Sequence, residues 1–373
     1  MSKKYLDPIA QQRLRDLLIT TRSSYKHFLG FPASLDFNYR ELAPIMQYML
    51  NNIGDPLVET WHTLSSKSFE YDVLAFFAEL FRAPKDAWWG YVANGSTECN
   101  LFALYVAREK LPDANVYYSQ AAHYSVPKNI HLLRQRGVPV ACQPNGEMDY
   151  TDLTRLLAEG NGQPAIVVAS IGTTMTEAKD NVALIRESLR ATGVMRSHIH
   201  ADAALAGAYL PFIEPLHPFD FTDGADSINV SGHKFMGSPV PCGIILVHKE
   251  DKQRLNAAAN YTGSIDATIS GSRNGHAPLF LWYTLERWGK DGLKRRLHQS
   301  LEIAAYTHRR LLDIGWKTWR NPNTLTIMLA TPPRELVIKW QLATQGEWSH
   351  VICMPGITKA KVDRFIADLA TIS

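Results

Sequence analysis

Two polar residues each end a short apolar segment near the middle of the chain. Asp202 follows residues 198–201, and Lys234 follows the apolar segment 226–230 and a Ser-Gly-His stretch. A buried carboxylate at a strand end is costly unless a cation faces it. Burial also lowers the pKa of a lysine amine and makes it nucleophilic. The pair therefore indicates one site that needs both an acid and a nucleophilic nitrogen.

Pyridoxal phosphate is a cofactor that needs this pair, because its aldehyde bonds a lysine and its ring nitrogen faces an acidic residue. A carboxylate that caps the next segment and a lysine that reaches the surface are the plainer alternatives. The small residues around both positions, such as Ala204 and Gly232, favour the cofactor site.

Three other stretches are candidates for the same site. Residues 94–97 read Asn-Gly-Ser-Thr before a predicted helix, whose N-terminal N–H groups favour a phosphate; simple helix capping is the alternative. His123 follows a predicted strand, where α/β sheets place ligands, although a lone histidine is often structural. Residues 271–276 read Gly-Ser-Arg-Asn-Gly-His. They predict either an anion site, in this subunit or a neighbour, or an arginine-anchored turn.

The elements that must position these residues follow an α/β pattern. Apolar periodicity predicts a mostly parallel sheet that helices cover on both faces. A long helical connection over 277–314, which ends at Gly315, leads to a smaller α/β unit. We expect an N-terminal arm with helices in 1–60, a large cofactor-binding domain in 61–275, and the connecting helix with a small C-terminal domain in 276–373. The predicted helices before the alternating region are 9–22, 41–52, 69–81 and 98–110.

Composition excludes several classes of protein. The 373 residues are 46% hydrophobic and 20% charged, and a net charge of +3 is too mild for a nucleic-acid partner. The four cysteines form no C-x-x-C pair, so we expect no metal site and a reducing compartment. The first residues lack the apolar core of a signal peptide, and the apolar runs are too short to span a bilayer. We expect a cytoplasmic protein without a membrane partner.

Together these motifs resemble the group II pyridoxal-phosphate-dependent amino-acid decarboxylases, in the branch of bacterial histidine decarboxylase and plant serine decarboxylase. The resemblance runs from about Phe28 to the C-terminus. It implies the aspartate-aminotransferase-like fold (fold type I) and a homodimer with active sites at the interface. The segments that carry it are 91–100, 123–126, 200–205, 231–234 and 271–276.

The resemblance also implies a role for each matched residue. Lys234 resembles the lysine that bonds the cofactor, Asp202 the partner of its ring nitrogen, and Ala204 a residue under the ring. His123 looks like the residue that stacks on the ring and contacts the substrate. The cofactor site would further include Gly95, Ser96, Thr97, Ser231, His233, Ser272 and Arg273.

Two features leave the substrate side open. Residues 255–270 are too short for the mobile catalytic loop of longer animal relatives, so Tyr261 or His233 is expected to protonate the product. Phe31 and Tyr261 are expected to contact the substrate. The family often has Thr, Gly and Gly where this chain has Ala93, Ser96 and Cys99. Backbone donors to a phosphate survive such changes.

The resemblance implies decarboxylation of an L-amino acid to its amine and CO₂. Residues 172–176 and 320–323 resemble bacterial histidine decarboxylases, whereas 54–56, 340–346 and 350–355 resemble the serine side. We predict L-histidine as the substrate and L-serine as the alternative. An aminotransferase or a Cα–Cβ lyase on the same fold is a second possibility, and a cofactor-free binding protein is a third.

Overall fold

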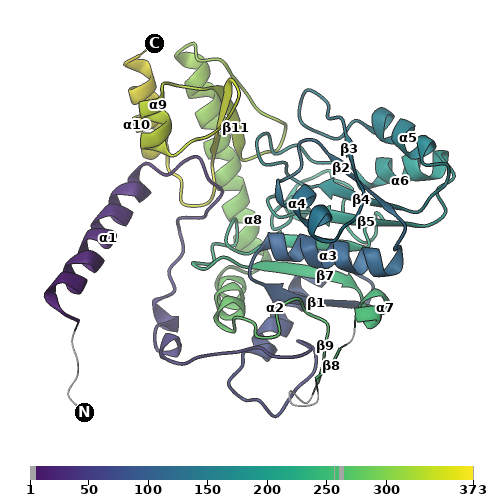
Figure 1. The fold of residues 1–373 in the computed structure, drawn as a ribbon. Helices are drawn as coiled ribbons and strands as arrows, with labels where there is room; N and C mark the ends of the chain where they lie inside the picture. Colours follow the sequence, from purple (N-terminus) through teal and green to yellow (C-terminus); the bar gives the residue numbers. More distant parts are fainter. Residues whose placement is uncertain (1–5, 256, 260–263, 373) are drawn as a thin grey trace.

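A seven-stranded sheet forms the centre of the computed structural model, which describes residues 6–255, 257–259 and 264–372 (Figure 1). The strand order is β1-β7-β6-β5-β4-β2-β3. Within this sheet β7 alone runs antiparallel to its neighbours. The strands are β1 (Trp88–Ala93), β2 (Asn115–Ser119), β3 (Gly137–Val140), β4 (Ala165–Ser170), β5 (Ser197–Asp202), β6 (Ser227–Ser231) and β7 (Gly243–His248).

Helices cover both faces of this sheet, which is why its central strands are continuous apolar runs. All six residues of β4 are buried. The caps explain where two helices begin, because the side chains of Asp149 and Asn181 accept N–H groups of the first turn. The helices are α2 (Lys67–Leu80), α3 (Ser96–Lys110), α4 (Ser125–Leu132), α5 (Tyr150–Glu159), α6 (Val182–Ala191) and the short α7 (Lys249–Lys252).

A second, antiparallel sheet lies in the C-terminal part, in the order β10-β11-β13-β12. The kinked helix α8 (His276–Asp313) connects the two sheets and bends at Gly289, whose φ is 58°. Thr358 caps the last helix, because its side chain accepts the N–H group of Lys361. The elements are β10 (Thr318–Trp319), β11 (Thr326–Ala330), α9 (Arg334–Trp340), β12 (Ala343–Gln345), β13 (Trp348–Ile352) and α10 (Lys359–Ala370). A small hairpin pairs β8 (Ala257–Ala259) with β9 (Ser264–Asp266).

Several predicted elements differ from the observed ones. The helix expected over 41–52 is wrong: only single 3-10 turns form at Arg40–Leu42 and Ile45–Gln47. Pro44 explains this, because proline lacks the N–H group of a helix interior and disfavours helix in the residue before it. In the C-terminal unit, the apolar pattern of 334–343 predicts a helix to residue 343, but the helix ends at Trp340, since Gln341 adopts a left-handed conformation with φ 53°. Strand β1 was not predicted.

The N-terminal helix α1 (Pro8–Lys26) extends beyond the predicted 9–22, and none of its 19 residues is buried. Asp7 caps it by accepting the N–H groups of Ile9 and Ala10. Figure 1 shows α1 lying apart from the body of the molecule. Leu17 is 63% exposed, so the apolar face of α1 has no partner within the described residues. Among all the residues that the structure describes, no helix is both long enough and apolar enough to cross a bilayer.

Candidate active site

One cleft of about 1410 Å³ lies at the carboxyl ends of the parallel strands. Ligands bind at this edge of open α/β sheets because the loops there diverge around a crevice. The C-terminal sheet closes one side of the cleft with β12 and His350. The sequence-predicted residues that line it are Phe31, Gly95, Ser96, Thr97, His123, Asp202, Ala204, Ser231, His233 and Lys234.

Asp202 is the last residue of β5 and only 6% exposed. Its Oδ2 accepts a hydrogen bond from Asn100 Nδ2 at 2.8 Å, and its Oδ1 accepts the Ala204 N–H at 3.3 Å. Within the described residues it has no ion-pair partner, as the ion pairs of the chain lie elsewhere. A buried carboxylate without a cation is costly. Asp202 therefore fits the protonated ring nitrogen of pyridoxal phosphate.

Lys234 follows β6 and enters the same cleft. Its Nζ has no hydrogen-bond partner among the residues that the structure describes. Burial lowers the pKa of this amine, and the negative charge of Asp202 raises it in part. A lowered pKa increases the fraction of neutral amine, which is the nucleophilic form. Lys234 is thus suited to bond the cofactor aldehyde.

The N-terminus of α3 also lines the cleft and offers hydrogen-bond donors to an anion. Gly95 precedes the helix with φ 156°, and Ser96 and Thr97 are its first two residues. Their N–H groups have no acceptor inside the helix, so they are available to an anion, which the helix dipole also favours. The Ser96 hydroxyl lies 2.7 Å from that of Ser231, which joins this turn to the end of β6.

His123 precedes α4 and is held by Ser125. The Ser125 backbone N–H donates to His123 Nδ1 at 3.2 Å, and the Ser125 hydroxyl lies 2.8 Å from the same nitrogen. Because the N–H can only donate, Nδ1 is the acceptor and Nε2 carries the proton of the neutral ring. Burial lowers the pKa of His123, while Asp202 raises it and Lys234 lowers it. A neutral, flat ring is therefore available beside the other two groups.

His233 lies next to the lysine in the cleft. The Cys242 backbone contacts its Nδ1 from two sides, the carbonyl oxygen at 3.0 Å and the amide nitrogen at 3.3 Å. These contacts require opposite proton positions, so they hold the ring in place without choosing its tautomer. Burial lowers the pKa of His233, which makes the neutral ring the main form at pH 7. A neutral histidine at this place can accept or pass a proton.

Other predicted site residues lie elsewhere. Ser272 and Arg273 do not line this cleft. The Arg273 side chain is buried, forms an ion pair with Glu70 and donates to the Gly54 carbonyl at 3.2 Å. Within this chain the guanidinium thus anchors a turn. A contribution of residues 271–276 to a neighbouring subunit stays a prediction. Tyr261 lies outside the described residues.

The cleft also contains residues to which the sequence did not give a role. Asn100, inside α3, holds Asp202, and its only sequence signal was its place at the end of segment 91–100. Thr344 and Gln345 reach the cleft from β12 of the second sheet. Their only sequence signal was the resemblance of segment 340–346 to serine decarboxylase.

Comparisons with known proteins identify the family. The pyridoxal-dependent decarboxylase conserved domain matches residues 45–315. A histidine decarboxylase of Mesorhizobium japonicum is 44% identical over 365 residues, which is 98% of this chain and 99% of that protein. A histidine decarboxylase of Morganella morganii is 42% identical over 344 residues, or 91% of each chain.

Solved structures agree on the fold. L-methionine decarboxylase from Streptomyces sp. 590 superposes with a TM-score of 0.91 at 27% identity, over 100% of this chain and 96% of that one. Glutamate decarboxylase from Lactobacillus brevis, at 19% identity, shares the fold with a TM-score of 0.80 over 100% of this chain and 93% of that one. The predicted fold class and cofactor are confirmed. This chain belongs to the pyridoxal-dependent decarboxylase family and is a carboxy-lyase that uses pyridoxal phosphate.

Proposed function

We propose that this enzyme decarboxylates L-histidine to histamine and CO₂. The choice of L-histidine rests on one observation, the 44% identity to a histidine decarboxylase over nearly its whole length. The cleft supports it, because the imidazole of histidine needs polar partners, and polar residues such as Thr344 and Gln345 line the cleft. L-serine is the alternative substrate, since segments 340–346 and 350–355 resemble serine decarboxylase.

The residues of the cleft have different proposed roles. When bound, the cofactor supplies an electron sink for the bond between Cα and the carboxylate. The negative charge of Asp202 would keep a proton on the ring nitrogen. Lys234 would supply the amine that bonds the cofactor. Ser96 and Thr97 would hold the phosphate with backbone N–H groups.

The remaining side chains position the reacting atoms. His123 presents a flat neutral ring whose Nε2 proton faces away from Ser125, in place to stack on the cofactor and contact the substrate. His233 lies beside Lys234 and can return a proton to Cα, with Tyr261 as the other candidate. Phe31, which is half exposed at the cleft, is expected to contact the substrate side chain.

A panel of free L-amino acids with purified protein tests the substrate. We expect CO₂ and histamine from L-histidine and much slower release from L-serine and L-methionine. Ethanolamine from L-serine, without histamine from L-histidine, would contradict the proposal. A keto acid formed without CO₂ would instead indicate an aminotransferase.

We also propose that the enzyme is a cytoplasmic homodimer with active sites at the subunit interface. The exposed apolar face of α1 supports a partner subunit. Tyr124, beside His123 at the cleft, is 69% exposed, which supports an interface there. The four cysteines are free thiols, three of them buried, which supports a reducing compartment.

We further propose the three-part division into 1–60, 61–275 and 276–373. Two separate sheets, each with its own apolar core, support the second and third parts. Leu29 packs in the core of the C-terminal sheet, which supports an arm that crosses between the two.

A further inference from the structure

The side chain of Asn100 uses its full hydrogen-bonding capacity inside the protein, where it is 1% exposed. Its Nδ2 donates to Asp202 Oδ2 at 2.8 Å and to Ser125 Oγ at 3.2 Å. Its Oδ1 contacts His200 Nε2 at 2.9 Å and accepts from Asn229 Nδ2 at 2.6 Å. An amide has two donor hydrogens and two acceptor lone pairs, so none is left over.

The direction of these bonds follows from Asp202. An ionised carboxylate can only accept, so the amide nitrogen of Asn100 must face it and the amide oxygen must face His200. His200 Nε2 therefore carries the proton. Burial lowers the pKa of His200 to about 4, so the ring is neutral at pH 7 and its Nδ1 accepts. The hydroxyl of Ser227, 2.9 Å away, is the donor.

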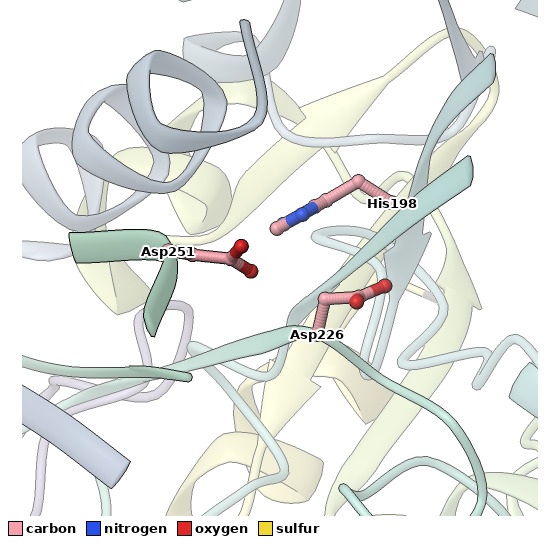
Figure 2. Close-up of side chains that lie close together, drawn as sticks. All are labelled: His198, Asp226 and Asp251. Atoms are coloured by element: carbon pink, nitrogen blue, oxygen red, sulfur yellow. The ribbon is translucent and has the colours of Figure 1, made fainter. Parts of the chain in front are cut away.

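The chain of bonds continues away from the cleft. Since the Ser227 hydroxyl proton goes to His200, its oxygen accepts from His198 Nε2 at 3.0 Å. His198 Nδ1 is buried without a hydrogen-bond partner, and Figure 2 shows its ring and the Asp251 carboxylate pointing toward one another with Asp226 beside them. The candidate ligand atoms of these three residues lie within 4.8 Å of one another.

Lys110 supplies the positive charge of this far cluster. Its Nζ lies 3.0 Å from Asp251 and 3.6 Å from Asp226, so an ammonium already neutralises part of the negative charge of these two carboxylates. Lys110 ends α3, and Asn100 lies in the same helix. The hydrogen-bonded chain therefore runs along one face of the sheet, from His198, which lies beside the ion-paired cluster, to Asp202 at the cleft.

A second arm starts from the same amide. Ser125 accepts from Asn100 and donates its own proton to His123 Nδ1, which leaves the His123 proton on Nε2. One buried amide thus contacts the carboxylate that faces the ring nitrogen and, through one hydroxyl, the histidine that faces the ring.

We propose that Asn100 is a positioning residue of this active site: it fixes the Asp202 carboxylate and the Ser125 hydroxyl that contacts His123, and the His200–Ser227–His198 arm keeps its amide in that orientation. The inference rests on the proposed role of Asp202. Without the donor from Asn100 the carboxylate is more basic and takes the proton of the ring nitrogen more readily.

The first test replaces Asn100 with alanine. The matched control is Asn115→Ala, because Asn115 is also a buried asparagine but lies in β2 outside the cleft, with a single long side-chain bond of 3.4 Å to Gln163. For Asn100→Ala we expect kcat to fall about 10- to 100-fold, the effect of losing one hydrogen bond to a charged group, with little change in KM. The control should keep both constants.

A spectroscopic signature separates positioning from folding. The ¹⁵N chemical shift of labelled pyridoxal phosphate, bound to each variant, reports the proton on the ring nitrogen. We expect it to move toward the unprotonated value in Asn100→Ala and to stay unchanged in Asn115→Ala. An Asn100→Ala protein that binds the cofactor with the wild-type shift and wild-type kcat would overturn the proposal.

The second test addresses the arm. Ser227→Ala removes a hydroxyl that does not reach the cleft, and we expect a decrease in kcat of about 2- to 10-fold. Combined with Asn100→Ala it should add little, because both act through one network. Effects that multiply in the double variant would show that the arm acts independently, and would overturn its proposed role.

The variant Asp202→Asn distinguishes a failure of the inference on Asn100 from a failure of the proposed role of Asp202. If Asp202→Asn changes the ¹⁵N shift and kcat while Asn100→Ala does not, the role of Asp202 stands and the inference on Asn100 is wrong. If Asp202→Asn changes neither, the proposed role of Asp202 is wrong, and the inference on Asn100 is overturned with it.

Discussion

At the scale of single residues, Asp202 and Lys234 are distinguished by the partners that surround their side chains. Asp202 has N–H donors but no cation, and the Lys234 amine has no hydrogen-bond partner among the described residues. A buried carboxylate is favourable when a cation faces it, and a buried amine when it forms a bond to a ligand. Both features agree with the proposed cofactor site.

Replacement of Lys234 by alanine should remove the group that bonds the cofactor. We expect CO₂ release to fall on the order of 10⁴-fold, the scale of losing an essential catalytic group, together with the visible absorbance of the bound cofactor. Steady-state assays and an absorption spectrum measure both. Lys361→Ala is the control, since burial lowers the pKa of Lys361 to about 8 but it lies outside the cleft. Equal losses in both variants would contradict the role of Lys234.

Acid stability should depend on His200. Burial lowers its pKa from 6.5 to about 4, so the unfolded chain takes up a proton at a higher pH than the folded chain. The stability from neutral His200 is complete above pH 6.5 and is lost as pH falls toward 4, by about 3 kcal/mol. Urea unfolding of the wild type between pH 7 and 4 should show this decrease. The free energy of unfolding of His200→Gln should depend less on pH, whereas the exposed control His298→Gln should show the same pH dependence as the wild type. An equal pH dependence in all three proteins would contradict the proposed contribution of His200.

At the scale of elements, the turn before α8 is tied to α2 and β1 by one buried carboxylate. Glu70 of α2 forms an ion pair with Arg273 and accepts the N–H of Val92 at 2.8 Å. Asn52 Nδ2 donates to the same carboxylate at 2.8 Å. Sequence patterns identified 271–276 as unusual but left two interpretations open. Within one chain the turn interpretation accounts for the arginine.

Arg273→Met should therefore destabilise the protein rather than weaken the cofactor site. Leaving Glu70 buried without its cation costs about 3–5 kcal/mol, and the double variant Arg273→Met with Glu70→Gln should recover part of that loss. Thermal unfolding measures stability, and titration of the apoprotein measures cofactor affinity. A stable Arg273→Met protein with weaker cofactor binding would favour the anion site instead.

At the scale of the whole molecule, α1 is the element that a single chain leaves unexplained. Leu14, Leu17 and Leu18 lie on one side of this helix and are exposed. A 19-residue helix with no buried residue draws little stability from its own chain, because helices in proteins are stabilised mainly by packing. A second subunit that covers this face would explain why the helix is retained.

Leu17→Glu should weaken the proposed dimer, whereas Gln12→Glu adds the same charge on the opposite side of α1 and should not. Burying one leucine contributes about 1.5–3 kcal/mol, so the dissociation constant should rise at least about 10-fold. Sedimentation at several concentrations measures it. If both variants dissociate alike, or neither differs from the wild type, α1 does not pack on a partner subunit.

Much of the fold and the centre of the site could be predicted from sequence alone. Alternating apolar segments indicated the parallel sheet, and Asp202 and Lys234 stood out because charged groups at the ends of buried strands need partners. These signals are local, so they survive without knowledge of packing. The helix predicted over 41–52 failed for a local reason as well, since Pro44 outweighs the apolar pattern around it.

Only the tertiary structure showed the contacts between residues that are far apart in the sequence. Asn100 meets Asp202 across 102 positions of sequence, and Glu70 meets Arg273 across 203. A hydrogen bond needs donor and acceptor within about 3 Å, and only the packing of α3 on the sheet, or of α2 against the turn before α8, sets that distance. For the same reason the role of Asn100, the internal use of Arg273 and the exposed face of α1 could be found only in the folded chain.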